Sequence, residues 1–453
     1  MAQKPSESQS RTEEGAAAAD GHLFPSPVEG ALLGGSPAMM PDPSPQATGM
    51  ATPAPRLRRF YVYQLLSVVH LTEAIWIIYL AKRGFSLSEI GLAEAIFHLA
   101  PISLELLTGS LADTFGRKWS LVLGSLCTAL SAFLMLQATE LWVVAIAMYV
   151  GGAGYTFRSG AQEAFLYDTL AEGGSSDRFT GVFGRLLSLN YVLIALTAWL
   201  GATLAGVSFT WPYALMVGVS LAAATVASGL REPERDRVAH RHLGRTIVEA
   251  LAVIRANPPL AALLIYNAAL WTCLTLIGLY GQAVLSELGL STPTVGLVIG
   301  STLLFTAVGA WLSSWITRRG DFRAWTVGLS LVLVAGGLGL GSEILALGIG
   351  LYFAAELAAG IYEPILMNRI NAGATAAQRA TIISVNGLLF SLTMIWAFPL
   401  GSWVAQRWSW LAMYSGAAAV VLLVLAVWLI VSARERPPGG GGSAAHVVDP
   451  GRA

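Results

Sequence analysis

Long apolar stretches follow one another between Phe60 and Val431, and they constrain the fold more than any other feature of the chain. A helix needs roughly 20 apolar residues to cross the hydrocarbon core of a bilayer. Twelve stretches meet this requirement, near 60–81, 88–111, 119–138, 141–163, 183–206, 211–230, 259–281, 294–316, 323–341, 345–366, 380–404 and 409–432. The sequence therefore predicts an all-α integral membrane protein with twelve transmembrane helices.

The composition agrees with a chain that folds in lipid. Charged residues make up 12% of the sequence, whereas soluble proteins carry about 25%. The formal net charge is zero and no basic stripe lies outside the loops, which argues against a nucleic-acid partner. Cys127 and Cys273 lie in separate apolar stretches, so we expect neither a disulfide nor a metal site, and no cofactor.

The distribution of Lys and Arg orients the predicted helices. Loops and tails on one side hold nearly all of these residues, while the other side holds Lys82, Arg83 and Arg407. The positive-inside rule then places both termini in the cytoplasm. We expect a multi-pass protein of the plasma or inner membrane, with disordered cytoplasmic tails at 1–57 and 435–453, where Pro, Gly, Ser and Ala dominate.

The loop after the second stretch carries a recognisable spacing. It reads Gly-x-x-x-Asp-x-x-Gly-Arg-Lys and contains Gly109, Asp113, Gly116, Arg117 and Lys118. This loop resembles the signature loop between the second and third helices of the major facilitator superfamily of transporters. The resemblance implies that Asp113 caps a facing helix end and that Arg117 pairs with an acid at the inner end of the fourth helix, here Asp168. These six residues would form a cytoplasmic gate that favours the outward-facing state by latching the two halves.

An internal repeat supports two six-helix halves. Residues 84–92 match residues 289–297 at an offset of 205, and the signature loop has a degenerate copy around 318–321. A repeat in the same orientation is typical of the major facilitator architecture. The halves would span 58–230 and 259–434. The cytoplasmic loop between them, 231–258, would form either a short helix on the membrane surface or a plain solvated linker.

Charged and polar residues inside the predicted helices are costly, about 2.5–3.5 kcal/mol each on insertion scales, and so mark candidate functional sites. We expect a water-filled cavity between the halves, lined by Glu73, Glu94, Glu105, Arg158, Gln162, Glu163, Glu356 and Glu363. A carboxylate that loses water as the cavity closes takes up a proton, and a nearby Arg opposes this. The alternative is that these residues form fixed ion pairs between helices.

The function predicted from these features is secondary active transport. Residues 158–170 are similar to the fourth helix of bacterial drug-exporter-like members, although the fifth helix lacks the Gly-Pro motif usual in proton-coupled exporters. The sequence contains no Gly-x-x-x-x-Gly-Lys-Ser/Thr, His-Glu-x-x-His or Gly-x-Ser-x-Gly motif, so we expect no enzyme and no direct use of ATP.

We therefore predict proton-coupled efflux of hydrophobic or drug-like small molecules by alternating access. Sodium is an alternative coupling ion, and we expect a monomer in the lipid bilayer. Two other functions remain open, namely proton-linked uptake of a small metabolite and a non-transporting sensor or scaffold with the same fold.

Overall fold

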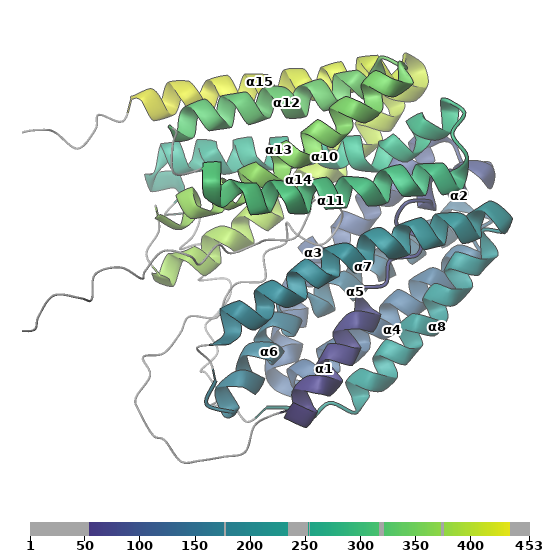
Figure 1. Ribbon diagram of the computed structural model, residues 1–453, viewed down its shortest axis with the longest axis vertical. Coiled ribbons are helices and arrows are strands. Elements are labelled where there is room, and N and C mark those ends of the chain that lie inside the picture. The colour runs from purple at the N-terminus through teal and green to yellow at the C-terminus, as the bar shows by residue number, and fades with distance from the viewer. Residues whose placement is uncertain are drawn as a thin grey trace, which may run out of the picture.

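The computed structural model describes residues 54–175, 178–233, 252, 254–316, 321–372 and 376–434, and within them the regular structure is helical, without strands. The first half contains α1 (Ala54–Ser67), α2 (Trp76–Lys82), α3 (Leu87–Phe115), α4 (Arg117–Leu136), α5 (Leu141–Arg158), α6 (Ala161–Glu172), α7 (Phe179–Val207) and α8 (Thr210–Ser228). The second half contains α10 (Pro258–Glu287), α11 (Thr292–Ile316), α12 (Phe322–Gly341), α13 (Leu345–Ala372), α14 (Ala376–Arg407) and α15 (Trp410–Ala433) (Figure 1).

The predicted helical membrane fold is confirmed, and the count of spans is confirmed in part. In the described part of the chain, ten helices are long and apolar enough to cross a bilayer, and they coincide with predicted spans two, three and five to twelve. Spans one and four are each divided into two helices. The predicted tails and most of the central loop lie outside the described residues, except that α1 begins at Ala54, four residues before the predicted boundary.

Span one is discontinuous, which corrects the prediction of an unbroken helix. The chain leaves helical geometry after Ser67 and resumes it at Trp76, and we call residues 68–75 the span-one break. Phe60 of α1 packs with Ala227 near the end of α8, whereas the Tyr79 ring of α2 lies 4.6 Å from the Tyr213 ring near its start. The two pieces therefore reach opposite ends of α8 and together cover its length. Periodicity could not reveal the break because the stretch contains no Gly or Pro to end the helix.

Span four bends instead of ending. The helix α5 stops at Arg158, Gly160 adopts a left-handed backbone with φ of 69°, and α6 continues to Glu172. Glycine tolerates this conformation because it has no Cβ. The span is therefore longer than the predicted 141–163, and neither of its pieces is counted among the ten apolar helices.

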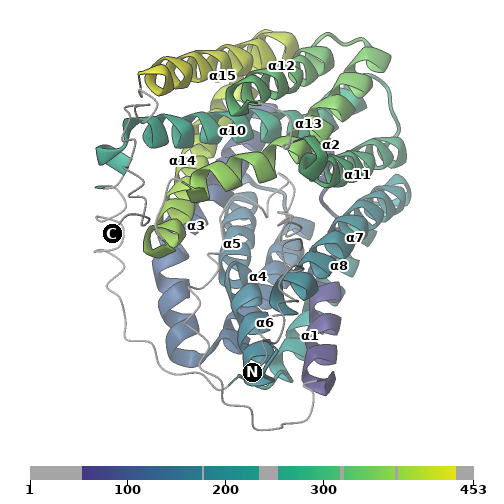
Figure 2. The same cartoon turned by 60° about the vertical axis from the view of Figure 1, so that its left-hand side comes forward.

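The two halves meet through two symmetry-equivalent pairs of helices. The helix α3 packs along α14, and α7 packs along α11, so that the second and fifth spans of each half contact the fifth and second spans of the other (Figure 2). At the outer ends, the Ser88 hydroxyl donates to Gln406 Oε1 at 2.7 Å, and Gly206 faces Pro293. These contacts seal the halves together on the side that carries α2.

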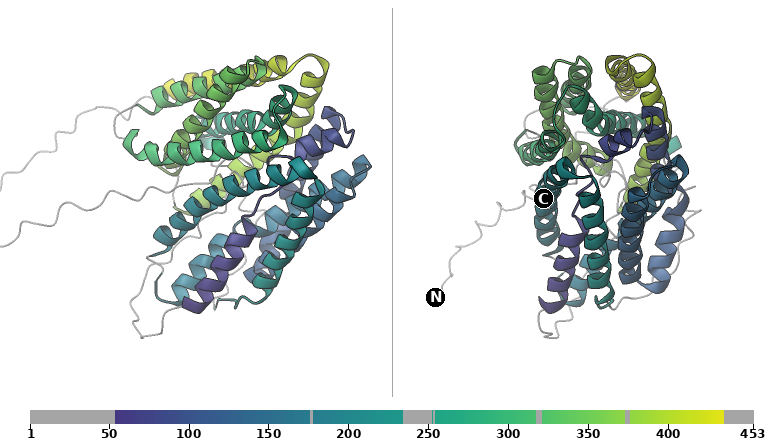
Figure 3. Two further views of the ribbon diagram at one scale, coloured as in Figure 1. Left: turned by 45° about the vertical axis from the view of Figure 1, so that its right-hand side comes forward. Right: turned by 90° about the vertical axis from the view of Figure 1, so that its right-hand side faces the viewer.

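The halves diverge toward the other side. One hydrophobic core runs through both halves, whereas a second, separate core around Phe60, Phe165 and Leu186 belongs to the inner part of the first half alone. Figure 1 and Figure 3 show the ribbons converging at the end with α2 and parting toward the end where α1 begins. The structure thus closes the side that carries α2.

Gly201 offers a test of how α7 accommodates the span-one break. A Cβ at this position would overlap the carbonyl oxygen of Leu71, which is backbone and cannot move aside. We expect Gly201→Ala to lower the stability by roughly 1–3 kcal/mol, the usual effect of overpacking, measured as the thermal unfolding midpoint in detergent. The matched control is Gly218→Ala on α8, where a Cβ meets nothing within 4 Å. Equal midpoints for the two variants would contradict the close approach.

Candidate functional site

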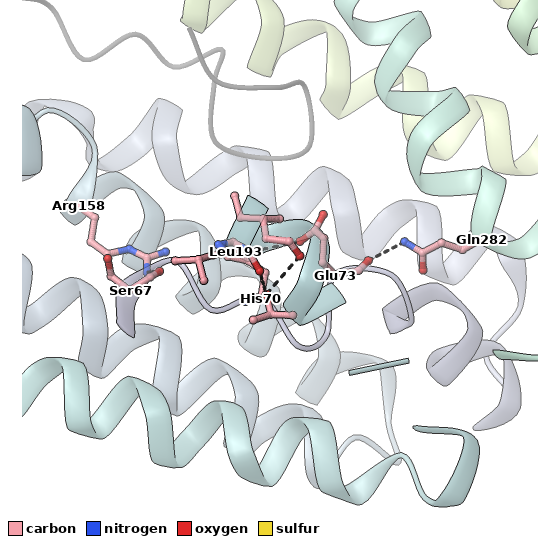
Figure 4. Close-up of polar contacts among 8 residues, drawn as sticks. Ser67, His70, Glu73, Arg158, Leu193 and Gln282 are labelled. Carbon is pink, nitrogen blue, oxygen red and sulfur yellow. Dashed lines mark hydrogen bonds and ion pairs between the residues drawn. The ribbon is translucent and has the colours of Figure 1, made fainter. Parts of the chain in front are cut away.

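The span-one break is held by side chains from both halves (Figure 4). Backbone outside a helix is stable at membrane depth only when protein groups or water satisfy it. From α7, Thr197 Oγ1 accepts a hydrogen bond from the His70 N–H at 3.1 Å. From α10, the Gln282 amide donates to the Glu73 carbonyl at 2.8 Å and accepts from the Ile77 N–H at 3.4 Å. The break is therefore an ordered part of the interface between the halves.

Glu73 lies inside this break, almost completely shielded. Its side chain is 6% exposed, and one carboxylate oxygen lies 3.4 Å from His70 Nδ1. The other oxygen, Oε1, has no hydrogen-bond partner among the described residues. Since an unpaired carboxylate in such a place is costly, the acid has the environment expected of a group that exchanges a proton or meets a ligand.

Glu94 forms a second acid–histidine pair on α3. Glu94 is 0% exposed, and its carboxylate lies 3.4 Å from His98 Nε2, one helical turn away. The imidazole of His98 stands edge-on to the Phe390 ring of α14 at 5.5 Å between centroids. The pair therefore lies where α3 meets the second half. His98 was not among the predicted site residues.

The second half contributes Glu356 and Glu363 from one face of α13, both buried. Glu356 Oε2 accepts a hydrogen bond from Thr306 of α11 at 2.8 Å. Tyr191 of α7 and Tyr352 of α13 are both buried, at 3% and 1% exposure.

Arg158 and Gln162 hold the end of α1. Arg158 Nη1 donates to the Ser67 carbonyl at 3.3 Å, and Gln162 Nε2 donates to Ser67 Oγ at 3.2 Å and to Tyr63 Oη at 3.4 Å. Carbonyls at a helix C-terminus lack intrahelical partners, and cationic or amide donors there stabilise the helix end. The structure places both residues against the inner edge of the span-one break.

Two further predicted residues lie apart from these contacts. Glu163 is in the first turn of α6 and is partly exposed. Glu105 is on α3, but its side chain lies outside the described part of the structure. Among the described residues, no three His, Cys, Asp or Glu side chains gather as metal ligands would.

Most of the signature motif is helical, and the connecting loop itself is a single residue. The helix α3 continues through Gly109 and Asp113 to Phe115, so both residues are helical, and the side chain of Asp113 lies outside the described part. Gly116 alone links α3 to α4, with φ of 103°. A side chain there would be strained, and a Cβ would lie 2.7 Å from Glu232 Cδ.

The charged groups around this turn join elements of the first half. Arg117 forms an ion pair with Asp168 of α6, as the family resemblance implied. The Glu232 carboxylate accepts hydrogen bonds from the backbone N–H groups of Arg117 at 2.7 Å and Lys118 at 2.9 Å. Lys118 Nζ lies 5.1 Å from the Trp119 ring centroid. These contacts all lie within the first half.

Sequence reasoning missed Gln282 and Glu232. Gln282 is the strongest omission, because an amide within a long apolar helix is itself a signal of a partner or ligand inside the membrane. Glu232 follows α8 in a charged run that reads as a solvated linker. The carboxylate oxygens of Glu232 bind the N-terminus of α4, the positive end of its dipole. This contact depends on the path of the chain after α8, so sequence spacing does not predict it.

The arrangement defines a helical membrane transporter with two pseudo-symmetric halves and buried acids between them. A family model described as Major Facilitator Superfamily matches residues 71–337, more than half of the chain. The chain belongs to the Major Facilitator Superfamily and is a transporter of that type.

A relative is the uncharacterized MFS-type transporter EfpA of Mycobacterium tuberculosis, found in two strains. It is 28% identical over 178 residues, which cover 39% of this chain and 33% of EfpA. The match therefore spans about a third of the length of these relatives.

Solved structures with the same fold include a nucleoside transporter and a D-xylose-proton symporter. A mutant form of the nucleoside transporter NupG gives a TM-score of 0.70 at 12% identity, covering 83% of this chain and 99% of NupG. A D-xylose-proton symporter gives a TM-score of 0.57 at 15% identity, covering 82% and 95%. At these identities the likeness concerns the fold alone.

Removing the Glu232 carboxylate tests the capping of α4. We expect Glu232→Ala to cost about 1–2 kcal/mol of stability and to speed hydrogen exchange at the amides of Arg117 and Lys118, because both donors lose a charged acceptor. Glu140→Ala is the matched control, since Glu140 precedes α5 but makes no side-chain cap. The capping role is wrong if both variants unfold and exchange like the unaltered protein.

Proposed function

We propose that this transporter exports hydrophobic or drug-like small molecules in exchange for protons, by alternating access between its two halves. The observation that carries the proposal is the set of acids buried inside the helical bundle: Glu73, Glu94, Glu356 and Glu363. A family member without an ATP-binding motif must draw on an ion gradient to move its substrate uphill. Buried acids that either half can cover or uncover are suited to bind and release the coupling proton.

Glu73 is the acid best placed for coupling. It lies in the span-one break, which is held by Thr197 from the first half and Gln282 from the second. His70, 3.4 Å away, would exchange the proton with Glu73. Glu94 and His98 would form a second pair that exchanges a proton in the same way. Glu105, on the same helix, is a further candidate for proton coupling.

Apolar rings beside the acids support a hydrophobic substrate. Phe390 stands against His98, and Tyr352 lies near Glu73 and Glu356. Aromatic side chains can bind planar or hydrophobic molecules of different shapes. The span-four resemblance to drug exporters, which includes Arg158, Gln162 and Glu163, points in the same direction.

The cytoplasmic cluster would act as the inner gate. Arg117 and Asp168, with Gly109, Asp113, Gly116 and Lys118, would set how the inner end of the first half docks on the second half when that side closes. Both termini would lie in the cytoplasm and the protein would work as a monomer in the plasma or inner membrane, as the distribution of Lys and Arg suggests.

Proton-linked uptake is the second candidate. One observation favours it: a D-xylose-proton symporter shares the fold, and the same acids would serve either direction of transport. The sensor or scaffold reading would gain support if a ligand bound without crossing the membrane.

Proton flux in proteoliposomes tests the proposal. A pH-sensitive dye inside the vesicles would follow flux while lipophilic cations, neutral drugs and small metabolites are added in turn. We expect drug-like compounds to drive proton flux in the unaltered protein, and Glu73→Gln and Glu356→Gln to abolish it, because an amide cannot carry the proton.

The matched control is Glu140→Gln, an exposed acid outside the site, which should leave flux unchanged. Flux driven only by metabolites moving inward would favour uptake, and solute crossing without any change in pH would point to sodium or to facilitated diffusion. Normal flux in both site variants would remove these acids from the coupling mechanism.

A further inference from the structure

Gln282 occupies the place of a helical hydrogen bond. In an α-helix the carbonyl of residue i accepts from the N–H of residue i+4, so Glu73 and Ile77 would bond directly if span one were continuous. Here the Gln282 amide donates to the Glu73 carbonyl at 2.8 Å and accepts from the Ile77 N–H at 3.4 Å. One side chain thus satisfies the Glu73 carbonyl and the Ile77 N–H, two of the backbone groups that the break leaves open. Figure 4 shows its bond to Glu73.

This bridge joins the two halves on their closed side. Gln282 belongs to α10 of the second half and is 1% exposed, whereas Glu73 and Ile77 belong to the first half. Ile77 and Gln282 are 205 residues apart, which is the offset of the internal repeat, so equivalent positions of the two halves meet here. Any movement that parts the outer ends of α2 and α10 must pull Gln282 away from the break.

Withdrawal of Gln282 would leave a carbonyl and an N–H unpaired inside the membrane. Buried polar groups without partners are costly, and they are most costly at membrane depth. The two groups can satisfy one another in only one simple way, by forming the helical bond that Gln282 replaces. The Glu73 carbonyl and the Ile77 N–H can therefore be satisfied in two ways. In one, Gln282 binds both groups and the break is unwound; in the other, they bind each other and the segment is helical.

We propose that Gln282 is a positioning residue that keeps the span-one break unwound while the outer side is closed, and that the break rewinds when the outer side opens. Rewinding turns Glu73 and His70 about the axis of the span, so the acid changes its surroundings in step with the opening. Thr197 and the close approach of Leu71 to Gly201 tie the break to α7, which confines the rearrangement to the first half. The inference rests on the proposed alternating-access function.

The first measurement is the closure of the outer side. Cysteines in place of Ser88 and Gln406, whose side chains are 2.7 Å apart, report closure by disulfide cross-linking in proteoliposomes, with Cys127 and Cys273 replaced by serine. We expect Gln282→Met, which keeps the shape without the hydrogen bonds, to slow cross-linking by about fivefold or more. Gln282→Glu keeps the acceptor and loses the donor, and should fall between.

The control is a buried amide on the same helix whose partner lies in its own half. Asn267 donates to Asn386 at 2.8 Å, and Asn267→Leu should cross-link at the unaltered rate. Cross-linking in Gln282→Met at the unaltered rate would overturn the proposal, and so would an equal loss in Asn267→Leu.

The second measurement tests whether Gln282 keeps the span-one break unwound or only holds the two halves together. Spin labels at the exposed positions Val62 of α1 and Lys82 of α2 report the length of span one. Each extended residue that returns to the helix shortens the span by about 2 Å, and residues 69–70 lie outside any turn, so the distance distribution of Gln282→Met should move to shorter values. A distribution that stays in place or lengthens would show that Gln282 only braces the interface.

Neither readout needs a substrate or an ion gradient. An error in the proposed substrate, direction or coupling ion would therefore leave both results intact. A failure of the rewinding inference would in turn leave the proton-flux result unaffected.

Discussion

The need to satisfy every backbone N–H and C=O away from water governs this structure. In hydrocarbon an unpaired backbone group costs several kcal/mol, so the chain is helical almost everywhere it crosses the membrane. In the described part of the chain, the longest interruption of a predicted span is the span-one break, where missing helical bonds are replaced by Thr197 from α7 and by Gln282 from α10. There, protein groups from both halves satisfy the irregular backbone.

The same interface collects the ionisable groups. Glu73 and Glu94 each stand 3.4 Å from a histidine of their own helix or segment, and Glu356 is hydrogen-bonded to Thr306. None of these three is joined to Arg158, whose guanidinium instead holds the end of α1 at Ser67. Among the described contacts, these three acids have histidine or hydroxyl partners. Histidine and hydroxyl partners can give up a proton or a hydrogen bond at modest cost, which suits groups that change state during transport.

Much of this could be predicted from the residues, and the failures have definite causes. The apolar stretches located ten spans to within a few residues. The division of span four needed the left-handed backbone of Gly160, and the residues around a glycine do not determine its φ. The cap of Glu232 on α4 joins residues more than a hundred positions apart, so local patterns contain no trace of it.

By itself, the sequence determined the helical membrane fold, the repeat and the presence of acids inside the bilayer, because hydrophobic length and polarity act through local composition. The tertiary structure alone decided where span one breaks. Residues 68–75 contain no Gly or Pro that would break a helix, and they leave it where groups from α7 and α10 serve as partners for their backbone. Partners that come from distant segments exist only after the two halves have packed, and for that reason no window of the sequence could reveal them.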